Sequence, residues 1–222
     1  MKKKMNPKKI AVVGAAVLIA GMATAGIVAA PRYSTTAVTR MNTNDMGIEL
    51  NAEEHVKKAM PGDEFAYPVT VTNTGDYISY LRVRINKSWY NGEEKMPDGD
   101  VSYIMLKKDG QEIKSGTGSD WIIQADDNGE DVYFYYRTPV DAHEETTELM
   151  DAYTIANISN SEQDTYAGKK VRIDVDTEEV QVPKLESGAV DTEKAADAIM
   201  SEWGLGVDID ASSGTIVSIE EE

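Results

Sequence analysis

Residues 67–86 read YPVTVTNTGDYISYLRVRIN, and this stretch decides the fold class. On both sides of the turn-forming residues 73–76, apolar side chains occupy every second position. These positions are Tyr67, Val69 and Val71 before the turn, and Leu81, Val83 and Ile85 after it. A period of two is typical of strands with one face buried, and Asn-Thr-Gly-Asp is typical of a turn. The pattern predicts two strands that pair as a hairpin over residues 64–88.

The same alternation continues along the chain. It predicts further strands over residues 101–106, 121–124, 132–136, 148–156 and 170–182. Several short strands with no helix between them indicate an antiparallel sandwich or barrel rather than an α/β fold. We therefore predict a mainly β protein with a β-sandwich domain over residues 45–182.

The last forty residues, 183–222, have a different pattern. Residues 191–203 predict a helix that begins at the N-cap Asp191 and stops at Gly204. Its apolar stripe, at helical spacing, is Ala195, Ala198, Ile199 and Trp203, which we expect to dock the helix on the sandwich. Residues 207–210 and 215–219 predict a terminal hairpin, followed by an acidic tail of three glutamates.

The N-terminal residues 1–30 have the composition of an export signal. Five lysines precede an uncharged apolar run over residues 10–30, which is 21 residues long. This order is typical of a signal peptide, and the length would also span a bilayer as a helix. We expect either a cleaved signal or a retained membrane anchor. Residues 31–44 are polar and threonine-rich, and we predict an extended arm there.

Composition excludes several classes of function. The 222-residue chain has 22 basic and 39 acidic residues and a formal net charge of −17. Without residues 1–30, which hold five lysines and no acid, the net charge is −22. Such a surface opposes nucleic-acid binding, and we expect salt or divalent cations to relieve repulsion between copies. The absence of cysteine removes disulfides, thiol nucleophiles and Cys-type zinc sites.

The chain has few residues for catalysis. Its two histidines, His55 and His143, have no second histidine four residues away, so the His-Glu-x-x-His motif of zinc proteases is absent. A nucleophile elbow and a phosphate-binding loop are absent as well. We predict a protein without enzymatic activity, with a metalloendopeptidase using both histidines as the alternative.

One turn has the composition of a weak cation site. Residues 126–131 contain Asp126, Asp127, Asn128 and Asp131, whose oxygens are suitable ligands for calcium. A plain hairpin turn explains the same residues, so we predict no cofactor, with weak calcium binding at this turn as the alternative.

Several segments together resemble the camelysin/TasA-like family of exported proteins from Gram-positive bacteria. They are MPGDE at 60–64, VTVTNTGD at 69–76, YLRVRINKSW at 80–89, YFYYRTP at 133–139, YAG at 166–168, the strand at 171–181 and residues 195–204 with their Trp-Gly end. The resemblance covers most of residues 47–204. It implies a jelly-roll-like sandwich, export, and deposition at the cell surface or in a biofilm matrix. It also implies fibres in which an N-terminal segment of one subunit completes the sheet of the next.

These observations predict an exported structural protein of the cell surface or biofilm matrix that self-assembles by strand addition. Its expected partners are further copies of itself or a related matrix subunit, together with the cell wall or membrane surface. We expect the added strand in the arm, where the alternating residues are Tyr33, Thr35, Ala37, Thr39 and Met41. Because the arm has few apolar residues, an unstructured wall spacer is the alternative. The second hypothesis is a monomeric binding module that displays Tyr133 and Tyr135, since aromatic residues often anchor interfaces.

Overall fold

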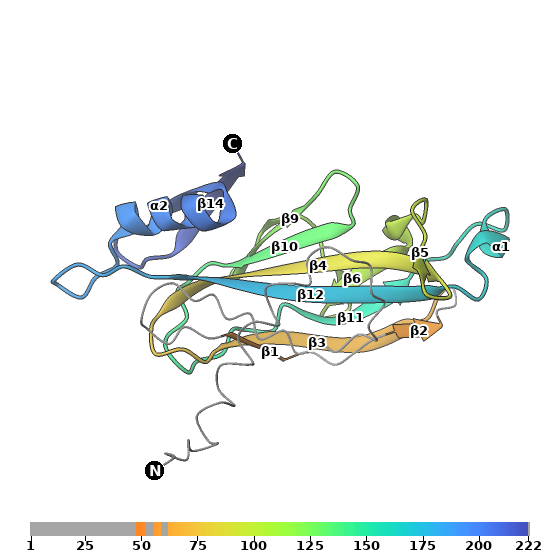
Figure 1. Cartoon of the computed structure of the whole chain (residues 1–222), viewed down its shortest axis with the longest axis horizontal. Helices are drawn as coiled ribbons and strands as arrows, with labels where there is room; N and C mark the ends of the chain where they lie inside the picture. Colours follow the sequence, from red (N-terminus) through yellow and green to blue (C-terminus); the bar gives the residue numbers. More distant parts are fainter. Residues whose placement is uncertain (1–47, 52–55, 59–61, 222) are drawn as a thin grey trace, which may run out of the picture. The chain divides into compact units, whose positions relative to one another are not determined.

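The computed structural model of the chain describes residues 48–51, 56–58 and 62–221. It shows a mainly β fold in which two antiparallel sheets pack face to face (Figure 1). The predicted β-sandwich is therefore confirmed, and the jelly-roll connectivity that the resemblance implies stays a prediction. Residues 1–30 and the arm at 31–44 lie outside the described residues. Within the part of the chain that is described, no helix is both long enough and apolar enough to cross a membrane.

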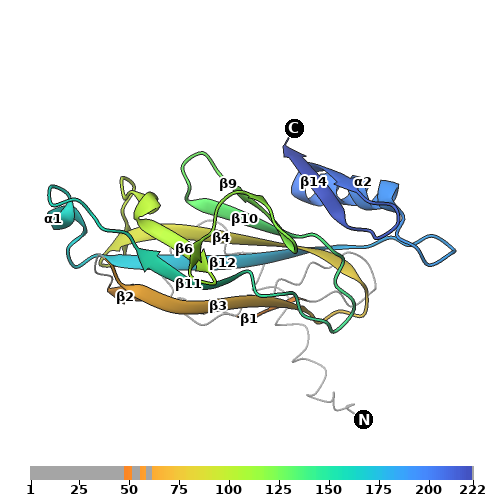
Figure 2. The ribbon, with the colours of Figure 1, turned by 180° about the vertical axis from the view of Figure 1, so that it is seen from behind.

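The smaller sheet has five strands in the order β1-β3-β11-β6-β7. Their bounds are β1 Ile48–Asn51, β3 Glu64–Asn73, β11 Met150–Ile155, β6 Ile104–Lys108 and β7 Gln111–Glu112. Figure 2 shows β3, β11 and β6 of this sheet from the side opposite to Figure 1. All neighbouring strands in it are antiparallel.

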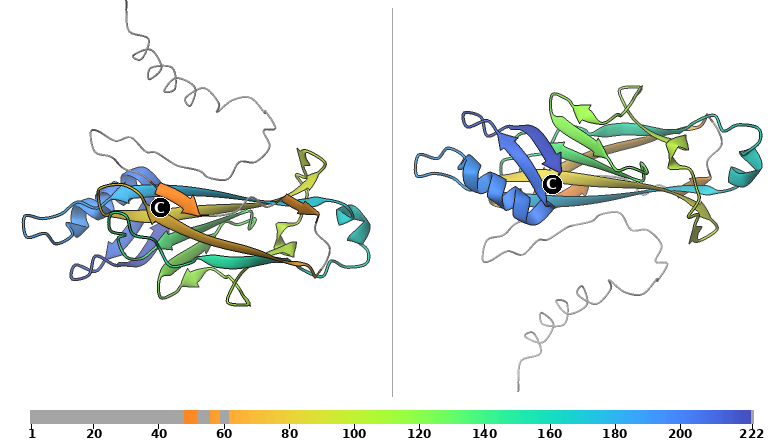
Figure 3. Two further views of the ribbon diagram at one scale, coloured as in Figure 1. Left: turned by 90° about the horizontal axis from the view of Figure 1, so that it is seen from below. Right: turned by 90° about the horizontal axis from the view of Figure 1, so that it is seen from above.

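The larger sheet has seven strands, six of them in the order β2-β12-β4-β10-β9-β8. Their bounds are β2 Val56–Lys58, β12 Lys170–Gln181, β4 Ser79–Asn91, β10 Asp131–Tyr136, β9 Trp121–Ala125 and β8 Gly116–Thr117. The seventh strand, β5 (Glu94–Lys95), pairs with the end of β4. The pairing of β4 with β12 covers every residue of β12, and Figure 3 shows the two strands running side by side.

The alternating apolar residues form the core between the two sheets. Side chains from both sheets belong to one buried cluster, including Val69, Val71, Leu81, Val83, Ile85, Tyr153, Val171, Ile173 and Val175. Each fully buried aliphatic side chain of this kind contributes about 2 kcal/mol relative to an exposed one. The alternation thus gives each sheet one apolar face, and burial of these two faces against each other stabilises the sandwich.

The predicted hairpin over residues 64–88 is wrong. β3 and β4 exist as predicted, but β3 belongs to the smaller sheet and β4 to the larger one. The connection is an arch held by the buried side chain of Asn73, which is fully inaccessible to solvent. Its Nδ2 donates to the backbone oxygens of Tyr77 (2.7 Å) and Val140 (2.9 Å), and its Oδ1 accepts from the Gly75 N–H (3.0 Å). These bonds replace the strand ladder that a hairpin would have.

Two short segments differ from the predicted strands. Residues Val101–Tyr103 form a 3₁₀ turn because the Asp100 carboxylate accepts a hydrogen bond from the Ser102 N–H, so β6 begins only at Ile104. The helix α1 (Gln163–Tyr166) was not predicted, because four residues are too few for a periodic pattern. It places the ring of Tyr166 against Trp89, with 4.7 Å between the ring centroids.

The C-terminal region is a helix and a hairpin that cover one end of the larger sheet. The helix α2 (Thr192–Trp203) has Asp191 as its N-cap and Gly204, at φ 68°, as its left-handed C-cap, as predicted. Its buried Ala195, Ile199 and Trp203 join a second cluster with Tyr80 and Tyr135 of the sheet. The strands β13 (Leu205–Ile209) and β14 (Ile216–Glu221) form the predicted hairpin. β14 extends through Glu221, so most of the predicted acidic tail is strand.

Candidate functional site

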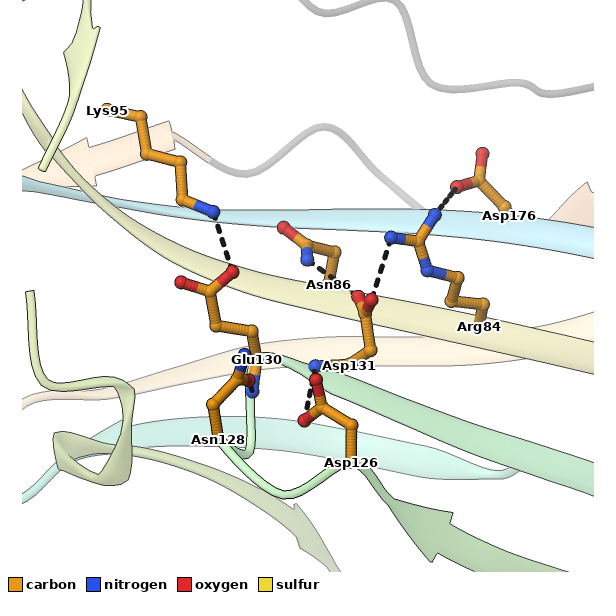
Figure 4. Close-up of polar contacts among 8 residues, drawn as sticks. All are labelled: Arg84, Asn86, Lys95, Asp126, Asn128, Glu130, Asp131 and Asp176. Carbon is orange, nitrogen blue, oxygen red and sulfur yellow. Dashed lines mark hydrogen bonds and ion pairs between the residues drawn. The ribbon is translucent and has the colours of Figure 1, made fainter. Parts of the chain in front are cut away.

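The turn between β9 and β10 uses its polar side chains to stabilise itself. The Asp131 N–H donates to Oδ1 of Asp126 at 3.2 Å, and the Glu130 N–H donates to Oδ1 of Asn128 at 2.7 Å (Figure 4). Gly129 occupies the left-handed region at φ 70°, which a residue without Cβ adopts without strain. Asp127 is exposed. The predicted hairpin turn is thus confirmed, and weak calcium binding at it stays a prediction.

Asp131 is held by cationic and amide donors from β4. Its carboxylate accepts from Arg84 Nη2 at 2.8 Å and from Asn86 Nδ2 at 2.6 Å (Figure 4). Burial by itself would raise the pKa of Asp131, but the Arg84 and Asn86 hydrogen bonds outweigh it and lower the pKa. Arg84 also lies 3.7 Å from Asp176 of β12. Among the residues that the structure describes, no group of three His, Asp or Glu side chains is arranged to hold a metal ion.

We predict that Asp131→Ala lowers the free energy of unfolding by about 2 kcal/mol, because Arg84 and Asn86 lose a half-buried, charge-assisted partner. Asp127→Ala, in the same turn, should change it by less than about 0.5 kcal/mol because Asp127 is exposed. Urea unfolding of both variants measures the difference. Equal effects would show that the contacts of Asp131 contribute nothing beyond the turn itself.

The two histidines are not brought together in the described part of the chain. His143 is exposed in a turn at φ 64°, with Nε2 3.8 Å from Asp76 Oδ1. His55 lies outside the described residues. The structure describes only one of the two histidines, so the metalloendopeptidase alternative stays a prediction.

The tyrosines of β10 are not displayed for a partner. Tyr135 is buried under the helix α2, with its ring centroid 6.0 Å from that of Trp203. Tyr133 is half-buried, and the Arg82 guanidinium lies 5.5 Å from its ring centroid. The prediction that Tyr135 is displayed for a partner is therefore wrong, because α2 covers it, whereas the binding module as such stays a prediction.

On one flank of the sandwich, part of the edge of β12 has no pairing strand among the described residues. Here β1 pairs only with residues 70–73 of β3, and β2 pairs only with residues 170–172 of β12. The remaining edge of β12, residues 173–181, has no pairing strand among the described residues, although β1 lies close to it. On the other flank the edge strands β7 and β8 have two residues each, and short strands are a common protection of edges.

The strand β12 has two chemically different faces. Towards the sandwich interior it places Val171, Ile173, Val175, Thr177 and Glu179, all buried. Towards the outer surface it places Asp174, Asp176 and Glu178, together with Arg172. The outer acids are partly compensated: Glu178 pairs with Arg82, and Asp174 with Arg172.

Glu179 breaks the apolar pattern of the inner face. Its side chain is buried, with 4% relative exposure, opposite Leu81 of β4. Neither carboxyl oxygen has a hydrogen-bond partner in the described structure, and the hydroxyl of its neighbour Thr177 has none either. Burial raises the pKa of Glu179 to about 7; the Ser79 hydroxyl acts in the opposite direction but donates to the Tyr77 oxygen at 3.4 Å.

A shallow surface pocket of about 540 Å³ lies beyond the end of β12. Its lining combines Asp76 with Lys184 and Lys194 and with the apolar residues Tyr77, Ile78, Val182, Pro183 and Ala198. Lys194 is engaged by Asp191 at 2.8 Å. We see no convergent set of reactive groups in this lining.

The predicted assembly residues Tyr33, Thr35, Ala37, Thr39 and Met41 lie outside the described residues, so their role stays a prediction. The open edge of β12 was not predicted, and its only signal in the sequence is the carboxylate of Glu179 at an inward position. No protein-family model and no curated protein matches the chain.

Proposed function

We propose that this chain is a structural protein of the cell surface or extracellular matrix that assembles by strand addition. The observation that carries the proposal is the edge of β12, where residues 173–181 pair with β4 on one side and have no strand on the other among the described residues. An unpaired edge presents N–H and C=O groups that can pair with another chain.

The length of the edge suits an added strand. Nine residues in extended conformation span about 30 Å, which is longer than most strands in globular proteins. The arm at residues 31–44 has fourteen residues and is therefore long enough to pair with the whole edge. Placement of the protein outside the cell rests on the export signal predicted over residues 1–30.

Deleting residues 31–44 should abolish filaments while leaving the sandwich folded. The described core is formed by side chains of the two sheets, so we expect the sandwich to fold without residues 31–44. Negative-stain electron microscopy of the exported chain measures filaments, and circular dichroism measures the fold. Filaments that persist in the deletion variant would discard the arm as the added strand.

A scrambled arm of the same composition is the matched control. It keeps the length and charge of residues 31–44 but changes the order of side chains along the strand. If alternation of side chains matters, the scrambled chain should behave as the deletion does. If only an extended polypeptide is needed, it should form filaments.

A further inference from the structure

Two turns of the larger sheet contain the dipeptide Asn-Gly. Asn91-Gly92 lies in the turn between β4 and β5, and Asn128-Gly129 lies in the turn between β9 and β10. Both asparagines are exposed, and the glycines have nearly the same left-handed backbone, with φ 67° and 70°. Because glycine has no Cβ, its peptide nitrogen is unshielded next to the asparagine amide. Attack of this nitrogen on the amide carbon closes a succinimide ring, so each turn holds both groups of an intramolecular reaction.

In the β9–β10 turn, hydrogen bonds occupy both of these groups. The side-chain Oδ1 of Asn128 accepts from the Glu130 N–H at 2.7 Å, which fixes the orientation of the amide. The Gly129 N–H donates to the backbone oxygen of Asp126 at 3.0 Å. Both bonds would have to break before the nitrogen could reach the amide carbon. The turn therefore protects Asn128 from this reaction.

In the β4–β5 turn, the corresponding nitrogen is free. The Gly92 N–H donates no hydrogen bond in the described structure. A Cβ added to Gly92 would have no heavy atom within 4 Å, its chain neighbours apart, so the turn also has room for a change of backbone conformation. Since φ is nearly the same in both turns, the difference between them lies in their hydrogen bonds.

The Asn91 amide is also polarised by a cation. Its Oδ1 accepts from Nζ of Lys169 at 3.0 Å. Lys169 directly precedes β12, and the pairing of Lys170 with Tyr90 brings the start of β12 to this turn. Negative charge develops on an amide oxygen when a nucleophile attacks the amide carbon, and a cation beside the oxygen stabilises that charge. Lys169 is thus placed to lower the barrier to the attack.

We propose that Asn91 is a site of spontaneous deamidation, with the Gly92 nitrogen as the nucleophile and Lys169 as the cation that stabilises the amide oxygen. The Gly92 nitrogen gives its proton to hydroxide and forms a bond to Cγ of Asn91. The bond between Cγ and Nδ2 then breaks, and the amide nitrogen leaves as ammonia after it takes a proton from water. Water opens the succinimide at either carbonyl, which gives aspartate or isoaspartate. The sum is asparagine and water to aspartate and ammonia, so no other reactant is needed.

The product changes the charge and the strand pairing at this turn. A carboxylate at position 91 would form an ion pair with Lys169 in place of the present hydrogen bond to a neutral amide. Asn91 now pairs with Glu94 of β5. Aspartate keeps this register, whereas isoaspartate adds a methylene to the main chain and shifts it. The reaction therefore gives the turn one more negative charge and, in the isoaspartate form, weakens the pairing of β5.

Peptide mapping by mass spectrometry tests the assignment. The purified chain is incubated at pH 8, and the deamidated fractions of the peptides with Asn91 and with Asn128 are followed over time. Asn91 should convert about tenfold faster or more than Asn128, because two hydrogen bonds must break at Asn128. In concentrated urea, where neither turn is folded, the two rates should become similar.

Lys169→Gln tests the role of the cation, and Lys170→Gln is its matched control. Each removes one positive charge beside the same turn, but Lys170 pairs with Glu93 and not with Asn91. Lys169→Gln should slow the conversion of Asn91 about threefold or more, whereas Lys170→Gln should leave it nearly unchanged. Lys169→Arg keeps the cation and should keep most of the rate. Circular dichroism checks that each variant is folded.

The outcomes separate the site from the role of the cation. Equal rates at Asn91 and Asn128 in the folded chain would overturn the site, and so would a difference in rate that persists in urea, because the fold would then not select Asn91. Equal rates in wild type and Lys169→Gln would overturn the role of Lys169 and leave Asn91 as the site. A folded chain in which Asn91 does not convert would overturn both.

Discussion

Glu179→Gln is expected to make the protein more stable by about 3 kcal/mol at pH 8. The pKa of this buried carboxyl is raised from 4.5 to about 7, so the folded chain holds its proton where the unfolded chain has lost it. The free energy of unfolding is therefore highest below about pH 4.5. It falls as the pH rises towards 7 and stays at the lower value above pH 7. A shift of this size corresponds to about 3 kcal/mol, and glutamine, which stays neutral, avoids the loss.

Urea unfolding of wild type and variant at pH 5 and pH 8 measures this effect. The difference between the two proteins should be large at pH 8 and small at pH 5. Glu178→Gln, which removes an exposed carboxylate paired with Arg82, should not gain stability at pH 8. If wild type and Glu179→Gln unfold alike at pH 8, the carboxyl is not the destabilising group that its burial indicates.

Asn73→Asp should have the largest destabilising effect, a loss of about 4 kcal/mol at pH 7. Asn73 donates two hydrogen bonds to the backbone oxygens of Tyr77 and Val140. An ionised carboxylate has no donor, so it would face both oxygens in a site without solvent access. Breaking such a buried polar network costs several kcal/mol. Part of the loss should be recovered at acidic pH, because a protonated carboxyl can donate one bond.

The same substitution at Asn128 is the control. Asn128 is exposed and uses Oδ1 to accept from the Glu130 N–H, which an aspartate also does. Asn128→Asp should change the free energy of unfolding by less than about 0.5 kcal/mol. A loss below about 1 kcal/mol for Asn73→Asp in thermal or urea unfolding would show that the arch is held by other contacts.

The positions of the strands could be predicted from the sequence because apolar residues alternate regularly along them. The sequence did not predict which strands pair with each other. Tyr67, Val69 and Val71 lie inward as the period of two indicates. That period says which residues share a face but does not say whether the chain turns back within one sheet or crosses to the other. The arch depends on Val140, which accepts from Asn73 across 67 residues of sequence. No local pattern contains such a contact.

The candidate site was predictable to a smaller extent. The residues 126–131 were identified as a turn, but the partner of Asp131 is Arg84, which lies on another strand 47 residues away. The structure also buries Tyr135, which the sequence shows only as one of two alternating tyrosines. The sequence does place Glu179 on the inner face, because it continues the alternation of Val171, Ile173, Val175 and Thr177. The sequence cannot show that this carboxylate stays buried.

Thr177→Val offers an independent check, because it removes the other buried polar group of this inner face without changing charge.

The pairing of β4 with β12 also sets the order in which the molecule can be made. Partners in this ladder are separated by 80 residues between Tyr90 and Lys170 and by 102 residues between Ser79 and Gln181. Long-range pairing of this kind slows folding, because a large loop must close before the contacts form. A growing polypeptide has no partner for this side of its longest strand, β4, until residue 170 has left the ribosome, so the larger sheet is completed only late in synthesis.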